Sequence, residues 1–261
     1  MENAIEVTKL SSYYGEREIL KRISFVIPKN MTTVILGGSG CGKSTLLKHL
    51  IGLLKPASGS ILIQGTDITQ LDEESMNEVR KKMGILFQGA ALLNSLNLLD
   101  NIALPVREHT RIKESTIGIM VRMKLDLVGL SGFEGFYPSQ LSGGMKKRAG
   151  LARAIALDPE LLFFDEPSAG LDPITAAGLD DLIVSLKNVF KMTIVVVTHE
   201  LPSVFTIADY VIMLDAGEVI FSGSLDELKM SDHPRIRMFL ERKPETGTYV
   251  PEDYFNIIAG E

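Results

Sequence analysis

The stretch of residues 37–45 has the residue types and the spacing of a phosphate-binding loop. Its sequence, GGSGCGKST, fits the pattern G-x-x-x-x-G-K-[ST], in which backbone N–H groups surround nucleotide phosphates and the lysine reaches the terminal ones. Lys43 would supply a point charge to the outer phosphates, and the hydroxyl of Ser44 suits Mg²⁺ coordination. The candidate nucleotide-binding residues of this loop are Gly37, Gly38, Ser39, Gly40, Cys41, Gly42, Lys43, Ser44 and Thr45.

A second candidate anion site lies much further along the chain, at residues 141–145 (LSGGM). Ser142, Gly143 and Gly144 form a Ser-Gly-Gly turn at the start of a predicted helix, and the free N–H groups of a helix N-terminus attract anions. One such site indicates a nucleotide-binding protein. Two of them indicate a nucleotide that is held between surfaces that must meet.

Two acidic residues, Asp165 and Glu166, directly follow the apolar run of residues 161–164. An acid at the carboxyl end of a buried strand lies on the ligand side of an α/β sheet. Asp165 would face Mg²⁺, as the acid of phosphoryl-transfer sites does, and Glu166 would polarise the attacking water. The alternative is that the two acids solvate the strand end or cap the next helix. The phosphate-binding loop favours the catalytic interpretation.

Three further side chains stand at the ends of predicted strands. His199 follows a run of apolar residues, where it would sense the γ-phosphate through a hydrogen bond, although a single histidine is more often structural or exposed. Gln88 carries an amide that can meet the metal or the water, and its backbone can act as a hinge. Tyr14 would stack on the nucleobase, with Tyr13 as the competing candidate. Stacking does not separate ATP from GTP.

The pattern of elements predicts an α/β fold that can position these residues. Residues 32–36 read as a buried strand that runs into the phosphate-binding loop, and residues 46–51 continue as a helix. Residues 5–14 resemble an edge strand with an antiparallel companion at 23–28. Strand signals are absent from 89 to about 156, which predicts an inserted helical subdomain. Further strands are expected at residues 60–64, 83–87, 161–164, 193–197, 210–214 and 218–221, with helices at 73–82 and 174–189.

The composition restricts the possible partners and the compartment. The chain has 261 residues, a net charge of −6 and one cysteine, and 45% of its residues are hydrophobic. Its apolar runs are strand-length, far short of a bilayer span, and a single cysteine fits a reducing cytosol. The acidic charge argues against a generic nucleic-acid role. The basic cluster Lys146-Lys147-Arg148 is interpreted as the solvated face of a helix.

In their order along the chain, these motifs resemble the ATP-binding cassette of ABC transporters. Within that resemblance, residues 37–45 are the Walker A loop, Gln88 is the Q-loop glutamine, and residues 141–145 are the signature. Residues 161–166 are Walker B, residues 168–172 are the D-loop, and His199 is the switch histidine. The resemblance covers residues 3 to 240 and implies a RecA-like core with a parallel sheet, an N-terminal antiparallel region and an inserted helical subdomain. It also implies hydrolysis of ATP to ADP and phosphate.

The resemblance further implies a head-to-tail dimer with a second copy of the chain, in which Ser142, Gly143 and Gly144 complete the neighbour's ATP site. The domains expected are a cassette at 1–242, with a core at 1–88 and 157–242 and a helical subdomain at 89–156, and a tail at 243–261 that contacts the partner subunit. One departure is Met145, where the family usually has glutamine. ATP hydrolysis is expected to survive this change because Ser-Gly-Gly is intact.

Several segments, among them residues 89–96, 106–110, 151–157 and 172–175, resemble the MCE-linked branch of the family. That branch implies phospholipid transport between the inner and outer membranes, with a transmembrane permease dimer, an MCE-domain lipid carrier and a STAS-domain regulator as partners. The chain would then be peripheral, on the cytoplasmic face of the inner membrane. Two alternatives stay open: an ABC importer or exporter of another substrate, and a soluble cassette that acts on nucleic acid or ribosomes.

Overall fold

The computed structural model describes residues 2–243. Within it the chain forms two compact units, one that ends at Leu225 and a second that begins at Asp226. Apart from Lys243, the tail expected at 243–261 lies outside the described residues. No helix in the described range is long and apolar enough to cross a lipid bilayer.

A six-stranded sheet forms the centre of the first unit, with the strand order β10-β9-β3-β8-β7-β6. Its strands are β3 (Thr32–Gly37), β6 (Met83–Leu86), β7 (Leu161–Asp165), β8 (Thr193–Thr198), β9 (Tyr210–Asp215) and β10 (Glu218–Ser224). Strands β6, β7, β8, β3 and β9 run parallel, and β10 pairs with β9 as an antiparallel hairpin. All residues of β3 and β8 are buried, as continuous runs of β-branched and apolar residues predict for central parallel strands.

The N-terminal strands form a separate four-stranded antiparallel sheet with the order β2-β1-β4-β5. Its strands are β1 (Asn3–Tyr14), β2 (Arg17–Pro28), β4 (Ser58–Ile63) and β5 (Thr66–Asp67). The prediction of an edge strand at residues 5–14 is wrong, because β1 lies between β2 and β4 and pairs with both. Alternation of polar and apolar residues reports one buried face and does not show whether a neighbouring strand exists.

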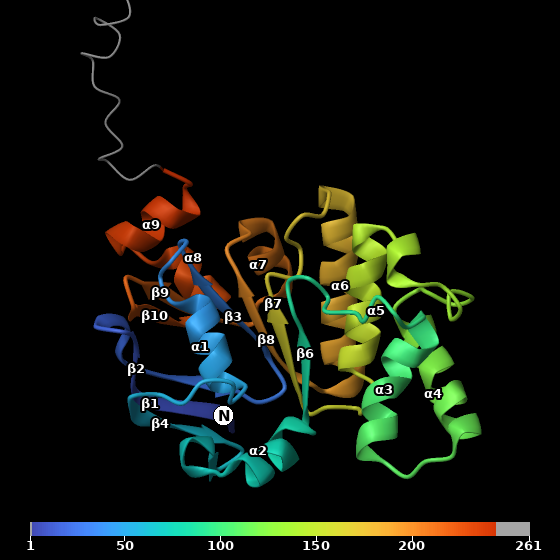
Figure 1. The fold of residues 1–261 in the computed structure, drawn as a ribbon. Coiled ribbons are helices and arrows are strands. Elements are labelled where there is room, and N and C mark those ends of the chain that lie inside the picture. Colours follow the sequence, from blue (N-terminus) through green and yellow to red (C-terminus); the bar gives the residue numbers. More distant parts are fainter. Residues whose placement is uncertain (1, 244–261) are drawn as a thin grey trace, which may run out of the picture. The chain divides into compact units, whose positions relative to one another are not determined.

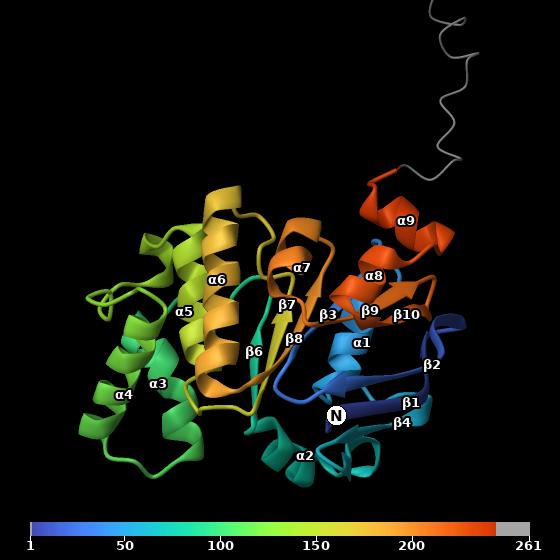
Figure 2. The same cartoon turned by 180° about the vertical axis from the view of Figure 1, so that it is seen from behind.

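Helices cover both faces of the parallel sheet. Figures 1 and 2 show α1 (Lys43–Leu50) on one face, and α6 (Pro173–Phe190) with α7 (Leu201–Ile207) on the other. The remaining elements of the first unit outside the insertion are η1 (Ile68–Gln70) and α2 (Glu73–Arg80). The second unit contains α9 (Pro234–Leu240) and nearly all of α8 (Leu225–Met230). The predicted α/β fold with a parallel sheet and an antiparallel N-terminal region is confirmed.

The helical insertion lies between β6 and β7, as the loss of strand signals after Gly89 predicted. It comprises α3 (Leu98–His109), α4 (Glu114–Leu127), η2 (Pro138–Gln140) and α5 (Gly143–Ala154), which cluster at one side of the sheet (Figure 1). Helix α5 also packs closely against β6. A Cβ atom at Gly150 would lie 2.8 Å from Leu86 Cδ1 and 3.0 Å from the Ala90 carbonyl oxygen, so glycine permits the close approach.

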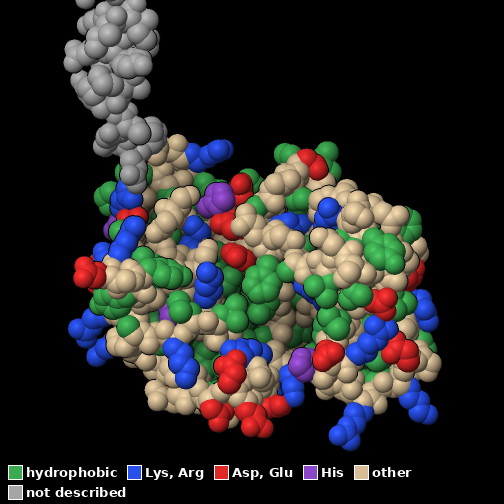
Figure 3. Space-filling view, in the orientation of Figure 1, with side chains coloured by type: hydrophobic (Ala, Val, Ile, Leu, Met, Phe, Trp, Pro, Cys, Tyr) green, Lys and Arg blue, Asp and Glu red, His purple; other side chains and the backbone are tan. Residues whose placement is uncertain are grey.

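Charged side chains of both signs are interspersed on the surface. On the face drawn in Figure 3, Lys and Arg side chains lie among Asp and Glu side chains. Several of these charges form ion pairs within the insertion: Arg107 contacts Asp100 at 2.9 Å and also pairs with Glu114. Partly exposed pairs of this kind hold local geometry and contribute little to stability.

Candidate functional site

The sheet register brings the predicted site residues to one edge. Leu36 of β3 pairs with Thr198 of β8, and Val197 of β8 pairs with Asp165 of β7. Because these strands are parallel, the residues that follow their carboxyl ends meet at the same edge of the sheet. The phosphate-binding loop, Asp165, Glu166, His199 and Gln88 all stand at or just beyond these strand ends.

The phosphate-binding loop forms the turn that the sequence predicts between β3 and α1. The buried ammonium of Lys43 donates hydrogen bonds to the carbonyl oxygens of Gly37 at 2.8 Å and Gly38 at 2.9 Å. These two bonds fold the lysine side chain back over the loop and satisfy a buried charge. Thr45 and Cys41 are buried, whereas Ser39 and Ser44 are exposed and available to a ligand. Burial raises the pKa of the Cys41 thiol, so this side chain stays neutral.

Gly42 is required by both its backbone and its surroundings. Its φ of 109° is in a region that favours glycine, and a Cβ atom there would lie 2.7 Å from Leu20 Cδ2. The hairpin of β1 and β2 therefore packs against the start of α1. Tyr14 stands at the tip of this hairpin and is exposed, while the hydroxyl of Tyr13 donates a hydrogen bond to Glu18 at 3.0 Å. Neighbouring residues of a strand face opposite sides, so Tyr14 points away from the side on which Tyr13 bonds to Glu18. Its exposed ring is therefore the one available to stack on a base.

Glu166 and His199 are joined by a hydrogen bond. His199 Nδ1 lies 2.9 Å from Glu166 Oε1. The second carboxylate oxygen, Oε2, is buried and has no hydrogen-bond partner among the described residues. A buried carboxylate oxygen without a partner is costly, because its lost hydration is not replaced by another hydrogen bond. The hydrogen bond to His199 holds the Glu166 carboxylate at the sheet edge that bears the phosphate-binding loop.

Asp165 lies among charges of both signs. Burial, followed by the neighbouring Glu166, raises the pKa of its carboxyl, and the ammonium groups of Lys48, Lys147 and Lys43 act in the opposite direction. A carboxylate that is partly desolvated and lies near a phosphate-binding loop is suited to a divalent cation, which would supply the missing positive charge.

The residues present fit a magnesium ion that is held partly by a nucleotide. The described chain contains no group of three or more His, Cys, Asp or Glu side chains placed to hold a metal. Mg²⁺ at nucleotide sites is typically bound by one or two protein oxygens together with phosphate oxygens. Ser44 and Asp165 offer one hydroxyl and one carboxylate, and Gln88, predicted as a third ligand, is exposed just beyond β6.

The second anion site forms the predicted helix start. Ser142 is the N-cap of α5, and its hydroxyl accepts a hydrogen bond of 3.3 Å from the Met145 backbone N–H. Because this cap uses the backbone of Met145, it does not need the glutamine side chain that is absent here. Within the described chain, residues 142–144 make no hydrogen bond to the phosphate-binding loop, so the structure does not bring these two sites together.

Sequence reasoning missed two basic residues of α5. Lys147, interpreted as part of a solvated face, is buried, with 6% of its surface exposed, and its ammonium donates to the Glu166 carbonyl. Arg153 donates to the carbonyl oxygens of Ala91 at 2.8 Å and Ala90 at 3.1 Å, directly after Gln88 and Gly89. The solvated-face prediction is thus wrong for Lys147, because a run of three charges on a helix points to more than one side.

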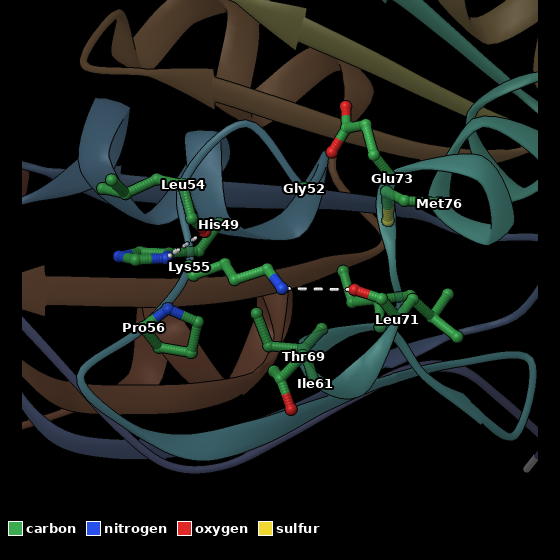
Figure 4. A pocket seen from close by; sticks show the side chains of 11 residues that line it. His49, Gly52, Leu54, Lys55, Pro56, Ile61, Thr69, Leu71, Glu73 and Met76 are labelled. Atoms are coloured by element: carbon green, nitrogen blue, oxygen red, sulfur yellow. Dashed lines mark hydrogen bonds between the residues drawn. The ribbon is translucent and has the colours of Figure 1, made fainter.

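A pocket at the opposite end of α1 is separate from this site. Figure 4 shows His49, Leu54 and Lys55 around it, at the far end of the helix from the phosphate-binding loop. His49 Nδ1 lies 2.8 Å from the Leu54 carbonyl oxygen, so Nδ1 carries the hydrogen. Nε2 is buried and without a partner among the described residues, and burial lowers the pKa of the imidazole.

Comparison with known proteins identifies relatives over most of the chain. The family model described as ABC transporter matches residues 20–169. The probable ribonucleotide transport ATP-binding protein mkl of Mycobacterium leprae is 46% identical over 91% of this chain, which spans 68% of that protein. The intermembrane phospholipid transport system ATP-binding protein MlaF of Haemophilus influenzae is 43% identical over 97% of both chains.

A solved structure has the same fold. The ATP-binding cassette MJ0796, in a dimeric post-hydrolysis state bound to ADP and Pi, aligns with a TM-score of 0.78 and 29% identity, over 85% of this chain and 98% of that one. The family match and these relatives bear out the resemblance drawn from the motifs. This chain therefore belongs to the ABC transporter family, as one of its ATP-binding, ATP-hydrolysing subunits.

Proposed function

We propose that this chain hydrolyses Mg–ATP at the edge of the parallel sheet. In this proposal the loop at residues 37–45 binds the phosphates, Tyr14 stacks on the base, and Lys43 neutralises charge on the terminal phosphates. Ser44, Asp165 and Gln88 would hold Mg²⁺, which neutralises phosphate charge when it is bound. Glu166 would take a proton from the attacking water, and His199 would bind the γ-phosphate.

The observation that carries this proposal is the state of the Glu166 carboxylate. One oxygen is hydrogen-bonded to His199, at the sheet edge that bears the phosphate-binding loop, and the other has no hydrogen-bond partner within residues 2–243. The test is release of phosphate from ATP by the purified chain, with Mg²⁺ and with a chelator in its place. Hydrolysis that is equally fast without a divalent cation would contradict the metal role of Ser44 and Asp165.

The site would be completed by a second copy of the chain. Residues 142–144 offer N–H groups and a hydroxyl at the start of α5, and they are exposed or half-buried without contacting the chain's own phosphate-binding loop. The similar MJ0796 cassette is itself a dimer when bound to ADP and Pi. The proposal is tested by mixing Lys43→Ala and Ser142→Arg variants. One site of a mixed head-to-tail dimer would keep both an intact loop and an intact signature, so activity should return on mixing.

The transported substrate is proposed to be phospholipid. Support comes from the similarity to MlaF, which extends over 97% of both chains, whereas this chain spans about two thirds of the mycobacterial relative. The partners would be a transmembrane permease dimer, an MCE-domain lipid carrier and a STAS-domain regulator. The chain would lie on the cytoplasmic face of the inner membrane.

The permease would contact the segment after Gln88. A cleft of about 300 Å³ lies beside this segment, lined by residues that include Arg80, Ile85, His109 and Arg153. The nearby loop is held by Asn101, whose buried amide bonds to the backbone of Leu93, Leu96 and Asn97. A rigid loop beside a cleft suits a helix inserted from another subunit.

Purification of the tagged chain with its native partners, followed by lipid mass spectrometry, tests the substrate. Recovery of a permease with bound phospholipid is expected. A second candidate, ribonucleotide transport, is favoured by the name of the 46% identical mycobacterial relative. Recovery of a permease with a soluble binding protein that carries nucleotide, and without phospholipid, would support that candidate instead.

The domain limits, with a core at 1–88 and 157–242 and a helical subdomain at 89–156, also remain part of the proposal.

A further inference from the structure

We infer that Lys147 is a positioning residue for Glu166, and that it holds the backbone of this acid in the conformation that water activation needs. The inference rests on the catalytic role proposed above for Glu166. It concerns a side chain that lies outside the nucleotide-binding motifs, because Lys147 stands in the second turn of α5, beyond the Ser-Gly-Gly start of that helix.

The burial of Lys147 calls for an explanation. Only 6% of its surface is exposed, and its ammonium donates a hydrogen bond of 3.3 Å to the carbonyl oxygen of Glu166. Burial lowers the pKa of this lysine, while the carboxylates of Asp165 and Glu166 favour its charged form. A buried ammonium costs free energy unless it is paired and hydrogen-bonded. The Glu166 carbonyl and the nearby carboxylates therefore stabilise the ammonium of Lys147 at this position.

The backbone of Glu166 is in a conformation that needs external support. Its φ is 46°, in the left-handed region that residues with a side chain rarely adopt. Its N–H donates to the Val197 carbonyl at 2.9 Å, and its carbonyl accepts from the Ala169 N–H at 3.2 Å and from Lys147. Strained backbone persists only where the surroundings hold it, and of these three contacts only Lys147 acts through a side chain.

The position of this contact gives it a functional consequence. Residues 142–144 at the start of α5 are proposed to face the nucleotide of a second copy, whereas Glu166 serves the nucleotide of its own chain. Helix α5 thus carries residues 142–144 at its start and, in its second turn, the lysine that contacts Glu166. A shift of α5 on nucleotide binding would therefore be passed to the carbonyl of Glu166. Displacement of a catalytic group by about 1 Å can slow a reaction by about a hundredfold.

The first experiment compares Lys147→Met, Lys147→Arg and Lys124→Met in the purified protein. Lys147→Met keeps the length and apolar stem but removes the donor, so kcat should fall about ten- to a hundredfold while ATP affinity is unchanged. Lys147→Arg keeps a donor and should recover much of kcat. Lys124 is another buried lysine, paired with Asp158 and outside the nucleotide-binding motifs, and Lys124→Met should keep kcat. Rates are expressed per ATP-bound molecule, so that unfolded protein does not lower the measured kcat.

The second experiment is a double-mutant cycle with Glu166→Gln, followed by single-turnover hydrolysis of labelled ATP over hours. If Lys147 acts through Glu166, adding Lys147→Met to Glu166→Gln should lower the residual rate no further. An unchanged kcat in Lys147→Met, or a loss of equal size in both backgrounds, would overturn the inference. Wild-type hydrolysis by Glu166→Gln would instead overturn the proposed role of Glu166. The two failures are therefore distinguishable.

Discussion

His199 Nδ1 and Glu166 Oε1 lie 2.9 Å apart, so the histidine at the end of β8 and the acid at the end of β7 form one hydrogen-bonded pair. The pair occupies one carboxylate oxygen, and the other is buried without a hydrogen-bond partner among the described residues. While it is bound to Glu166, Nδ1 cannot contact a γ-phosphate. The proposed phosphate contact of His199 therefore requires the other ring nitrogen or a release from the acid.

Replacement of Glu166 by glutamine should separate ATP binding from hydrolysis. The amide keeps the size of the side chain but cannot take a proton from water, so kcat should fall by about 10²–10⁴. Nucleotide binding should remain, and the protein should accumulate as an ATP-bound dimer in size-exclusion chromatography. Hydrolysis at the wild-type rate would show that another group activates the water. Glu160→Gln, just before the opposite end of β7, provides a matched control.

Removal of the imidazole in His199→Ala should slow hydrolysis more than it weakens ATP binding. The side chain is half exposed, and its neighbours within 4 Å include the carboxylates of Glu166 and Glu200, so its removal leaves no cavity in the core. The fold-change in kcat, compared with the fold-change in the dissociation constant of a fluorescent ATP analogue, checks this expectation. A loss of affinity with kcat unchanged would mean that His199 binds substrate and transition state equally. His233→Ala serves as the control.

Lys43→Ala should abolish ATP binding or turnover. The ammonium bonds to the carbonyl oxygens of Gly37 and Gly38, so the charge is already held inside the loop that would surround the phosphates. Isothermal titration calorimetry with ATP should show weakened binding in Lys43→Ala. Lys48→Ala should bind ATP normally, because the charge that it removes is outside the loop. Equal losses in both variants would show that only the total charge near α1 matters.

Acidification should destabilise the protein through His49. Burial lowers the pKa of this imidazole from its ordinary value of 6.5, and the bond to the Leu54 carbonyl opposes that effect. Well above pH 6.5 both the folded and the unfolded chain hold His49 neutral. As the pH falls below 6.5, the unfolded chain binds a proton at His49 more readily than the folded chain does. The free energy of unfolding therefore decreases as the pH decreases.

Urea unfolding of wild type and His49→Gln at several pH values between 7.5 and 5.5 measures this contribution. As the pH falls, the wild type should lose more unfolding free energy than His49→Gln does. His233→Gln, at an exposed position, should follow the wild type. A difference that is independent of pH would contradict the assignment of the buried neutral form.

Asn101→Ala should lower the unfolding free energy by about 1–3 kcal/mol, because the change leaves buried backbone groups of the preceding loop without partners. The wild-type amide accepts from the Leu93 N–H at 2.8 Å and donates to three carbonyl oxygens. Urea unfolding gives the free energy, and proteolysis near Leu93 reports the loop. Asn94→Ala, at an exposed position of the same loop, should have little effect.

The main elements, and the meeting of the candidate site residues at one sheet edge, could be predicted because their signals are local. Thr32–Gly37 is a continuous buried run, and the loop that follows it has a fixed pattern of glycines before Lys43. The acid after β7 and the histidine after β8 were found by the same reasoning, since parallel strands bring their carboxyl ends to one edge.

Contacts between distant segments could not be read from the chain. The interior position of β1 depends on its pairing with β4, and the burial of Lys147 depends on how α5 packs against the turn that contains Glu166. A charged residue on a helix carries no local mark of whether it faces solvent or another chain segment. A basic residue one or two turns after a signature-type helix start would be worth inspecting in similar sequences.

The strand order has a consequence for how the protein is made. Strand β3, which carries the phosphate-binding loop, is among the first segments to leave the ribosome, yet its two neighbours, β8 and β9, are among the last. Until they arrive, an apolar strand has no partners in its sheet, and unpaired strand edges promote aggregation. Nascent chains that stop before β8 should therefore need chaperones, and nucleotide binding should begin only when β9 has been synthesised.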